Sequence, residues 1–483
     1  MRVHEPVGGQ LEILSKDDVE TIHRGTVQVL TKMGIKVWEP RAFALFKDAG
    51  AEADPKTKMV RIPEGLLKET VRKAPSEFYM YGRDPRYRLR MGAKRVHFSS
   101  AGQTVKVHDL EGHVRDALLK DTEDVAKICD SCEFIHHVSV GTTPKDVPDE
   151  VHGLHHIWAN WRNSVKTTDG YNYGTELSGR TLEMLSILRG GKEEMMKTPT
   201  LLGYMNPVSP MQLSTELVEG AMIYSKFNQP MLYAPEALAG GTAPVTLAGL
   251  LVQQNAEVLS GIMVSQMVRP GAPVLYGTVS AALDMKTGTP ALGGPEVGLI
   301  NIATAQLARY YNLPCRGTGG NTDSKVNDVQ SGFESATTLL MAALAGMNFI
   351  YDAAGSLETS LTMSLEKIVM DNELCGMVSR VLEGIDVSED SLAIDDICKV
   401  GPSASHLGTG LTLKRFRSEH FIPALLDRRS RDSWLKDGGK DMQTRAREKT
   451  RAILKEHRPE PLDRTVSAEI ERYLKSVTKN AVR

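Results

Sequence analysis

Four tyrosines stand where a short apolar run of this sequence gives way to a polar loop. The face of a phenol ring is negative, so several rings around one cavity suit a quaternary ammonium ion, which carries a fixed charge and no N–H group. These residues are Tyr204, Tyr233, Tyr276 and Tyr351. We predict that they form a substrate cage and that Tyr351 also acts in catalysis. The simpler interpretation is that each ring fills the protein core.

Carboxylates follow the same apolar runs. A carboxyl group whose pKa is raised by burial can act as an acid or a base near neutral pH. We predict this catalytic role for Glu236 and Asp352, and substrate contacts for Asp169, Asn206 and Asp323. Spacing alone does not single out a catalytic pair. Hydrogen bonding within the loops is the alternative role for each of these side chains.

A glycine-rich loop, RGTGGNTDSK, covers residues 316–325. An arginine in such a loop can hold a carboxylate through two parallel hydrogen bonds, and we predict this role for Arg316. The backbone N–H groups of the loop could instead bind a phosphate, which barrel enzymes often hold at this position. A structural loop with an exposed arginine is the third alternative.

Cysteine and histidine pairs raise the alternative of a metal site. Cys129 and Cys132 have C-x-x-C spacing, and His152, His155 and His156 follow helical spacing. Thiolate and imidazole are zinc ligands. Because these residues fall on elements far from the glycine-rich loops in the predicted topology, we predict no metal at the functional site.

Eight apolar runs must position these side chains. They begin near residues 96, 134, 164, 200, 231, 274, 314 and 348. Roughly 30 to 40 residues separate neighbouring runs, which is enough for a strand, a loop and a crossover helix. Parallel strands buried on both faces read as unbroken apolar stretches, such as PVLY at 273–276. The pattern predicts an α/β fold, a (β/α)8 TIM barrel, with its functional site at the C-terminal ends of the strands.

The rest of the chain flanks this barrel. We predict an N-terminal α+β addition over residues 1–95, the barrel over 96–384 and a C-terminal helical extension over 385–483. Ser15 and Asp18 form a capping pair for a first helix, and Pro63 suits the start of another. The N-terminal segment could cover one end of the barrel.

Two helices within the barrel have distinctive apolar patterns. A row that includes Val326, Val329 and Phe333 predicts a helix packed against the sheet along that row. Residues 245–267 are apolar nearly all round, which predicts a helix buried beneath both the barrel and a partner subunit. We therefore expect a homo-oligomer.

Charge and cysteine content narrow the class of protein. The 58 basic and 60 acidic side chains leave a net charge of -2, which argues against a nucleic-acid partner. We find no run of about 20 apolar residues and no signal-peptide pattern, and expect a cytoplasmic protein without membrane contact. Five cysteines in 483 residues are too few for a disulfide framework, which fits a reducing compartment.

Five ordered motifs identify a family resemblance. They are LGYMNPVSP at 202–210, GPE at 294–296, GGNTDSK at 319–325, DVQSGFE at 328–334 and YDAAGSLE at 351–358. With these motifs the chain resembles the trimethylamine methyltransferase family, specifically the branch that lacks pyrrolysine and includes glycine betaine methyltransferase. The likeness is strongest between Leu201 and Glu383 and extends more thinly over most of the chain.

The resemblance implies a (β/α)8 enzyme that moves a methyl group from an N-methylated amine to the Co(I) of a corrinoid. The corrinoid would be supplied by a separate small partner protein, and no cofactor would be tightly bound here. No residue of this chain stands for pyrrolysine, so a quaternary amine of the betaine type is the expected small-molecule substrate, with Arg316 as the anchor of its carboxylate.

Two other functions compete with this one. A zinc-dependent corrinoid methyltransferase acting on methanol or a thiol would use the cysteine and histidine clusters. A non-catalytic betaine-binding protein would keep the tyrosine cage without turnover.

Overall fold

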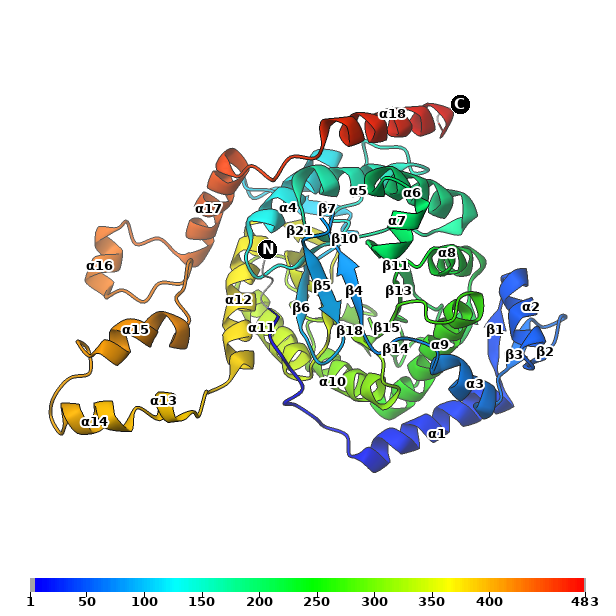
Figure 1. The fold of residues 1–483 in the computed structure, drawn as a ribbon, viewed down its shortest axis with the longest axis horizontal. Helices are drawn as coiled ribbons and strands as arrows, with labels where there is room; N and C mark the ends of the chain where they lie inside the picture. The colour runs from blue at the N-terminus through cyan, green and yellow to red at the C-terminus, as the bar shows by residue number, and fades with distance from the viewer. Residues whose placement is uncertain (1–4, 482–483) are drawn as a thin grey trace.

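A closed barrel of eight parallel strands forms the centre of the computed structural model, which describes residues 5–481 (Figure 1). In chain order the barrel strands are β6 (His97–Ser100), β9 (His137–Val138), β10 (Thr167–Asp169), β11 (Leu201–Met205), β13 (Met231–Tyr233), β15 (Val274–Gly277), β18 (Cys315–Thr318) and β19 (Phe349–Ala354). Each strand pairs in parallel with its neighbours, and β19 closes the ring on β6. All eight predicted apolar runs are confirmed as barrel strands.

A ring of helices surrounds the strands, as the crossover connections require. Its main members are α4 (Leu119–Ser131), α5 (His152–Asn163), α6 (Gly174–Arg189), α8 (Thr215–Lys226), α9 (Leu247–Val268), α10 (Pro295–Tyr310), α11 (Val329–Leu344) and α12 (Leu365–Glu383). A short helix, α7 (Lys192–Lys197), leads into β11. Apolar side chains between this ring and the outer faces of the strands make up the largest core of the protein.

The N-terminal segment packs beside α9. It contains α1 (Lys16–Lys32), α2 (Pro40–Asp48) and α3 (Glu64–Val71), with a small sheet in which β1 (Ile35–Val37) joins β3 (Met59–Arg61), β2 (Glu52–Ala53) and β12 (Gln212–Leu213). Ser15 and Asp18 cap α1 reciprocally, as predicted. Gly34, with φ of 87°, takes the left-handed conformation that ends this helix.

Helix α9 is buried, but its cover differs from the prediction. The helices packed against it include α1 and α3 of the same chain, so the N-terminal segment takes the place expected for a partner subunit. Among residues 5–481, α9 alone is long and apolar enough to cross a membrane by length and composition. Because 72% of that apolar window is buried inside the protein, its composition suits a core helix.

A β-hairpin closes the N-terminal end of the barrel. Strands β4 (Phe78–Tyr81) and β5 (Arg88–Met91) pair antiparallel and cross the barrel opening in Figure 1. Met80, Leu89 and Met91 are fully buried in a separate apolar cluster with barrel residues such as Leu232 and Phe349. The prediction that the N-terminal segment covers one end of the barrel is confirmed, and the hairpin carries out that role.

Loops at the opposite end of the barrel are reinforced by two small sheets. One contains β14 (Leu238–Ala239), β16 (Ala281–Leu283) and β17 (Pro290–Ala291). The other contains β7 (Lys106–His108), β8 (Val114–Asp116), β20 (Ser356–Leu357) and β21 (Thr362–Ser364). Both sheets follow the C-terminal ends of barrel strands, so they build the walls of the barrel mouth.

The first part of the predicted apolar row, before and at the start of α11, was assigned to the wrong face, whereas Leu340 and Leu344 further along the helix pack against the core as predicted. Val326, Val329 and Phe333 are 49%, 69% and 71% exposed, whereas small residues such as Ser335 and Ala342 face the sheet. Small side chains let the helix approach its neighbours closely, so close packing rather than the larger apolar row sets its orientation.

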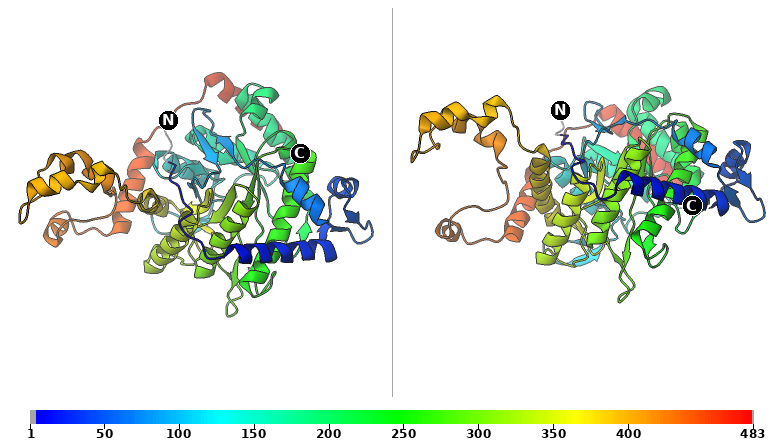
Figure 2. Two further views of the ribbon diagram at one scale, coloured as in Figure 1. Left: turned by 60° about the horizontal axis from the view of Figure 1, so that its bottom comes forward. Right: turned by 90° about the horizontal axis from the view of Figure 1, so that it is seen from below.

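The C-terminal part leaves the barrel as an arm and then returns. Four short helices, α13 (Glu389–Leu392), α14 (Ile394–Val400), α15 (Gly410–Glu419) and α16 (Arg431–Lys436), stand away from the barrel (Figures 1 and 2). The chain comes back through α17 (Met442–Glu456), which packs on α12 and α4, and ends with α18 (Arg464–Ala481) on α6. We refer to residues 385–441 as the arm.

We predict that truncating Leu89 destabilises the barrel. Leu89→Ala should lower the free energy of unfolding by about 2–5 kcal/mol, because it leaves a cavity between the hairpin and the barrel interior. Leu361→Ala is the matched control, since Leu361 is 55% exposed, and its effect should stay within about 0.5 kcal/mol. Denaturant unfolding followed by circular dichroism measures both values. Equal losses in the two variants would show that the hairpin does not seal the barrel.

Candidate active site

The alternation of side chains along each strand decides which residues face the barrel interior. On β13, Leu232 packs inside the barrel, so Tyr233 points out toward the helices. On β15, Leu275 packs inside and Tyr276 points outward. The hydroxyl group of Tyr233 lies 2.5 Å from Ser265 Oγ on α9.

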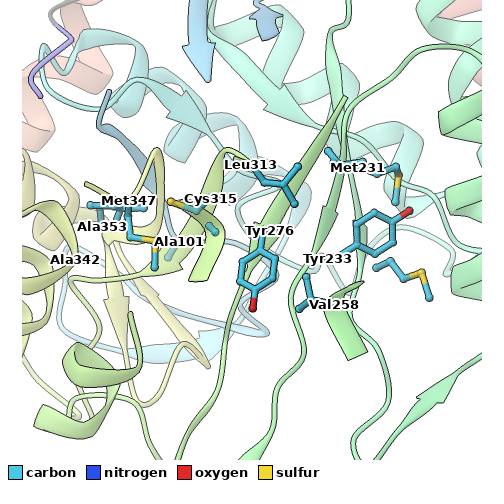
Figure 3. Packing of buried hydrophobic residues seen from close by; sticks show 14 of the residues in the cluster. Ala101, Met231, Tyr233, Val258, Tyr276, Leu313, Cys315, Ala342, Met347 and Ala353 are labelled. Carbon is cyan, nitrogen blue, oxygen red and sulfur yellow. The ribbon is translucent and has the colours of Figure 1, made fainter. Parts of the chain in front are cut away.

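Tyr276 is bound in the same outer layer. Its hydroxyl group donates to Asn255 Oδ1 of α9 at 2.8 Å. Figure 3 shows Tyr233 and Tyr276 among the buried side chains around Val258, which also belongs to α9. The predicted cage of four tyrosines is therefore not formed, because two of the rings lie on the outer side of the barrel wall.

Tyr204 and Tyr351 do meet inside the barrel mouth. Their ring centroids are 6.1 Å apart with an interplanar angle of 84°, and their hydroxyl oxygens are 3.3 Å apart. Burial, reinforced by the negative charge of Asp169, raises the pKa of both phenols well above the ordinary value. Both rings therefore remain neutral phenols and present uncharged faces and hydroxyl groups to the mouth.

A buried polar network fixes the position of Tyr351. Asp169, at the end of β10, accepts hydrogen bonds from Ser139 Oγ at 2.6 Å and from the Tyr351 hydroxyl group at 3.3 Å. Ser139 and Tyr351 also hydrogen-bond directly. The other carboxylate oxygen of Asp169 lies 2.8 Å from His137 Nε2. Asp169 was predicted to contact the substrate, but the structure shows its two oxygens engaged by protein side chains.

Arg316 lies against the face of Tyr351. The guanidinium carbon is 4.8 Å from the centroid of that ring, a distance at which a cation is attracted to the ring face. Nη1 donates to the carbonyl of Thr278 at 2.5 Å, whereas the buried Nε has no hydrogen-bond partner among the described residues. Burial lowers the pKa of Arg316, and the nearby Asp352 opposes that shift. The guanidinium therefore keeps a donor for a bound anion.

A β-bulge sets the position of Asp352, the residue that follows Tyr351 on β19. The register between β19 and β6 shifts between Ile350 and Ala354, and Asp352 has a positive φ of 61°. Consecutive strand residues normally face opposite sides, and a bulge re-aims one of them. Burial raises the pKa of Asp352, while Arg316 lowers it. Asp352 and Arg316 are consequently two buried groups of opposite charge, each of which shifts the pKa of the other.

Asn321 belongs to the site, although the sequence did not single it out. Its side-chain nitrogen donates to Asp352 at 3.0 Å and to Ser360 Oγ at 3.0 Å. Its buried Oδ1 has no hydrogen-bond partner among residues 5–481. A buried amide oxygen without a donor is costly, so this atom is suited to a donor on a ligand or a water molecule.

Glu236 lies near Arg316 and Asp352. Its side chain is exposed, yet surrounding loops bury the carboxylate enough to raise its pKa. Arg316 lowers that pKa and Asp352 raises it, which places all three charges around one space. Glu236 thus lies after the end of β13 with its side chain exposed, among the mouth residues where the sequence analysis expected it.

Asp323 and Asn206 occupy other parts of the mouth. Asp323 accepts hydrogen bonds from the backbone N–H groups of Leu292 and Gly293 and from Thr359 Oγ1. These bonds join three mouth loops, so Asp323 has a structural role in place of the predicted substrate contact. Asn206 is exposed just after β11.

The glycine-rich loop does not present a phosphate cradle. The N–H of Gly319 donates to the carbonyl of Tyr351, and the N–H of Gly320 donates to Thr338 Oγ1. Gly320 has a φ of 88°, and a Cβ there would lie 2.9 Å from the backbone of Ala353. Glycine therefore allows this loop to pack tightly against β19, which accounts for the composition that had suggested phosphate.

A pocket of about 520 Å³ opens beside Tyr204. Tyr171 and Tyr173, from the loop after β10, share its lining with Tyr204 and with Asp149. Tyr171 also hydrogen-bonds to His152 at 2.6 Å. Two tyrosines that were not singled out from the sequence thus surround the approach to the barrel, together with a carboxylate. Their position after a barrel strand, in the motif TTDGYNYG at 167–174, was the available signal.

The residues considered for zinc are engaged elsewhere or buried as thiols. His152 hydrogen-bonds to the Tyr171 hydroxyl group, and His155 Nε2 lies 3.0 Å from Thr478 Oγ1. Burial raises the pKa of the Cys129 and Cys132 thiols, which disfavours the thiolate that binds zinc. Within the part of the chain that the structure describes, no three His, Cys, Asp or Glu side chains form a group that could hold a metal ion. The site can instead hold a cation against phenol rings and an anion against Arg316.

Comparison with known proteins assigns the chain to a family. A sequence profile of trimethylamine methyltransferase (MTTB) matches residues 3–481. The chain is 35% identical to the glycine betaine methyltransferase of Desulfitobacterium hafniense (strain Y51), with 96% of each chain aligned. It is 36% identical to the trimethylamine methyltransferase MttB of Methanosarcina thermophila, with 94% of this chain and 95% of the relative aligned.

The fold also matches a solved structure. The monomethylamine methyltransferase of Methanosarcina barkeri superposes with a TM-score of 0.53 over 97% of this chain and 88% of the other, at 9% sequence identity. At that identity the likeness concerns the barrel architecture alone. The profile match over nearly the whole sequence, with two relatives above 30% identity, shows that the chain belongs to the trimethylamine methyltransferase family.

Proposed function

We propose that this protein transfers a methyl group from a quaternary amine of the betaine type to the corrinoid of a separate partner protein. The observation that carries the proposal is the pairing of Arg316 with Tyr351. A guanidinium donor without a partner among the described residues lies beside phenol rings, so the barrel mouth offers groups for a carboxylate and for a quaternary ammonium ion. Membership of the trimethylamine methyltransferase family supports the reaction type.

A quaternary nitrogen simplifies the chemistry required of the protein. When a methyl group is removed, the leaving group is a neutral tertiary amine, which needs no proton from an acid. The reduced cobalt of the corrinoid supplies the nucleophile. The side chains have to orient one methyl group toward the mouth and exclude water.

The charges of the site must be balanced for this task. The nitrogen loses its positive charge as the methyl group departs, so a cage that bound the cation too strongly would favour substrate over transition state. Two neutral phenols, Tyr204 and Tyr351, stabilise a cation moderately. The carboxylates of Asp352 and Glu236 supply additional negative potential. We propose that they position the substrate through charge and do not transfer protons.

We propose that the corrinoid reaches the site on its carrier protein and is not bound tightly by this chain. The barrel interior below Tyr204 is filled by Leu202, Leu232, Leu275 and Phe349, and the hairpin closes the other end. A large flat macrocycle therefore has to approach from the mouth. The pocket lined by Tyr171 and Tyr173 lies on that side.

The decisive experiment is a methyl-transfer assay. The purified protein is mixed with a reduced corrinoid protein and with glycine betaine, choline or trimethylamine, and methyl-Co(III) formation is followed by absorbance. We expect turnover with the betaine, and less with choline because choline lacks a carboxylate for Arg316. Arg316→Met should raise the KM for the betaine by roughly tenfold or more and leave that for choline nearly unchanged.

The outcomes of this assay separate the alternatives. Tight betaine binding by calorimetry without turnover would favour a non-catalytic binding protein. Turnover with trimethylamine but with no quaternary amine would contradict the proposed substrate class.

We predict that the rings of the mouth, and not those of the outer layer, contribute to substrate binding. Tyr204→Ala should raise KM by about 5- to 30-fold, the effect of losing a cation–ring contact of about 1–2 kcal/mol. Tyr204→Phe keeps the ring and should stay within a few-fold of the wild type. Tyr276→Phe is the control on the outer side of the wall and should leave KM unchanged. A large KM effect in Tyr276→Phe would contradict this assignment.

The raised pKa of Asp352 predicts how substrate binding depends on pH. As the pH falls toward that pKa, protonation removes a negative charge next to the bound cation, so KM should rise as the pH is lowered from neutral into the acidic range. Asp352→Asn already lacks this charge. The KM of Asp352→Asn should be roughly tenfold higher than that of the wild type at neutral pH, and it should change less with pH. Glu236→Gln in addition should remove the remaining dependence of KM on pH. A wild-type KM that stays flat over this range would show that neither carboxylate faces the cation.

A further inference from the structure

A second cavity, of about 470 Å³, lies between the N-terminal helices and the C-terminal end of α10. Its lining includes His23 of α1, Lys68 of α3, Arg72 directly after α3, and Tyr310, the last residue of α10. The chain enters barrel strand β18 shortly after Tyr310. This cavity is therefore beside the N-terminal ends of the barrel strands, away from the mouth.

A chain of hydrogen bonds behind the cavity fixes the role of His23 Nδ1. The Thr26 hydroxyl group donates to the carbonyl of Val252 at 3.1 Å, so its oxygen accepts from Asn255 Nδ2 at 2.9 Å. The same amide nitrogen donates to the Tyr311 hydroxyl oxygen at 2.8 Å. The Tyr311 hydroxyl group has no other acceptor among the described residues, so it donates to His23 Nδ1, which lies 2.9 Å away.

The other ring nitrogen of His23 carries a donor without a partner. Burial, with the positive charge of Lys68, lowers the pKa of His23, and Glu64 and Glu20 oppose this shift only in part. A neutral imidazole that accepts at Nδ1 has its hydrogen on Nε2. His23 is 3% exposed, and its buried Nε2 has no hydrogen-bond partner among residues 5–481. A buried donor without an acceptor is costly, so this N–H group is suited to an acceptor on a ligand.

The charges around the cavity favour an anion as that acceptor. Among the described residues, its lining contains two cations, Lys68 and Arg72, and no carboxylate. Lys68 forms an ion pair with Glu64 one turn earlier on α3. Arg72 is exposed and forms no ion pair within residues 5–481. A guanidinium group with free donors can hold a carboxylate through two parallel hydrogen bonds.

The remaining lining suits an organic ligand better than an inorganic anion. Leu67 and Val71 of α3 are buried beside the cavity. The ring of Tyr310 has its centroid 5.2 Å from that of His23, so two flat rings adjoin these apolar side chains. Small-molecule sites have volumes of about 300–1,000 Å³ and combine an apolar wall with a few polar groups. This cavity has that size and that combination.

We propose that this cavity binds a small organic carboxylate. Its oxygens accept hydrogen bonds from His23 Nε2 and from Arg72, and its apolar body packs against Leu67, Val71 and Tyr310. Because α1, α3 and α10 all contribute to the lining, the bound molecule joins the N-terminal segment to the barrel. No residue of the mouth takes part, so the site is independent of methyl transfer.

Isothermal titration of the full-length protein with benzoate tests the site. We expect a Kd of about 1 mM or tighter, and binding of benzyl alcohol at least tenfold weaker, because benzyl alcohol keeps the ring and lacks the charge. Arg72→Gln and His23→Phe should each weaken benzoate binding by about tenfold or more. Lys73→Gln is the matched control, since Lys73 is an exposed cation next to Arg72 but outside the lining, and it should leave the Kd unchanged.

Two further measurements separate this cavity from the mouth, which also contains a guanidinium group. Arg316→Met and saturating glycine betaine should both leave the benzoate affinity unchanged. In protein labelled with 15N-histidine, NMR should show His23 as the Nε2–H tautomer and a shift of its Nε2 signal on addition of benzoate. Circular dichroism checks the fold of each variant.

Several results would overturn the proposal. They are the absence of binding up to about 10 mM benzoate, equal binding of benzyl alcohol, or phosphate binding as tight as that of benzoate, which would indicate a site for any anion. A loss of affinity in Arg316→Met but not in Arg72→Gln would place the benzoate in the mouth. A His23 ring with its hydrogen on Nδ1 would remove the donor on which the site depends.

Discussion

A buried positive charge organises the mouth of this barrel. Arg316 is 3% exposed, and a guanidinium so far from water is tolerated only where opposite charge and oriented hydrogen-bond acceptors surround it. Asp352 supplies the nearest opposing charge, the carbonyl of Thr278 accepts a hydrogen bond, and the face of Tyr351 covers the group. Tyr351 is in turn held by Ser139 and Asp169. The orientation of each of these side chains therefore depends on the others, and strands β9, β10, β18 and β19 are joined through them.

The barrel itself could be predicted from the sequence, because its strands are buried on both faces. A run such as VLYG at 274–277 is apolar throughout, and eight such runs at crossover spacing leave few other topologies. The position of each strand followed from that pattern. The face on which a given side chain lies did not, because a continuous apolar run contains no alternation to define its inner and outer residues. Tyr204 and Tyr276 occupy similar places in the sequence pattern, yet one points into the mouth and the other into the helical layer.

Other parts of the site depended on features that a sequence pattern does not encode. The inward position of Asp352 results from a bulge on β19 that brings two consecutive residues to the same side. Ser139 is a small residue directly after β9, and only its contact with Asp169 and Tyr351 identifies it. Small residues of α11, and not the larger apolar side chains at its start, pack against the sheet. The N-terminal helices cover α9 where a second subunit was expected. Each of these outcomes comes from tertiary contacts between distant segments.

The hairpin of β4 and β5 has a kinetic consequence for the proposed reaction. Because the hairpin seals one end of the barrel, the amine enters and the demethylated product leaves through the mouth at the other end. The methyl acceptor has to approach the same mouth. For the proposed reaction, a carrier that covers the mouth when it docks would require the amine to bind first and the demethylated amine to leave last. The closed end thus makes the order of binding and release depend on how the carrier sits on the mouth.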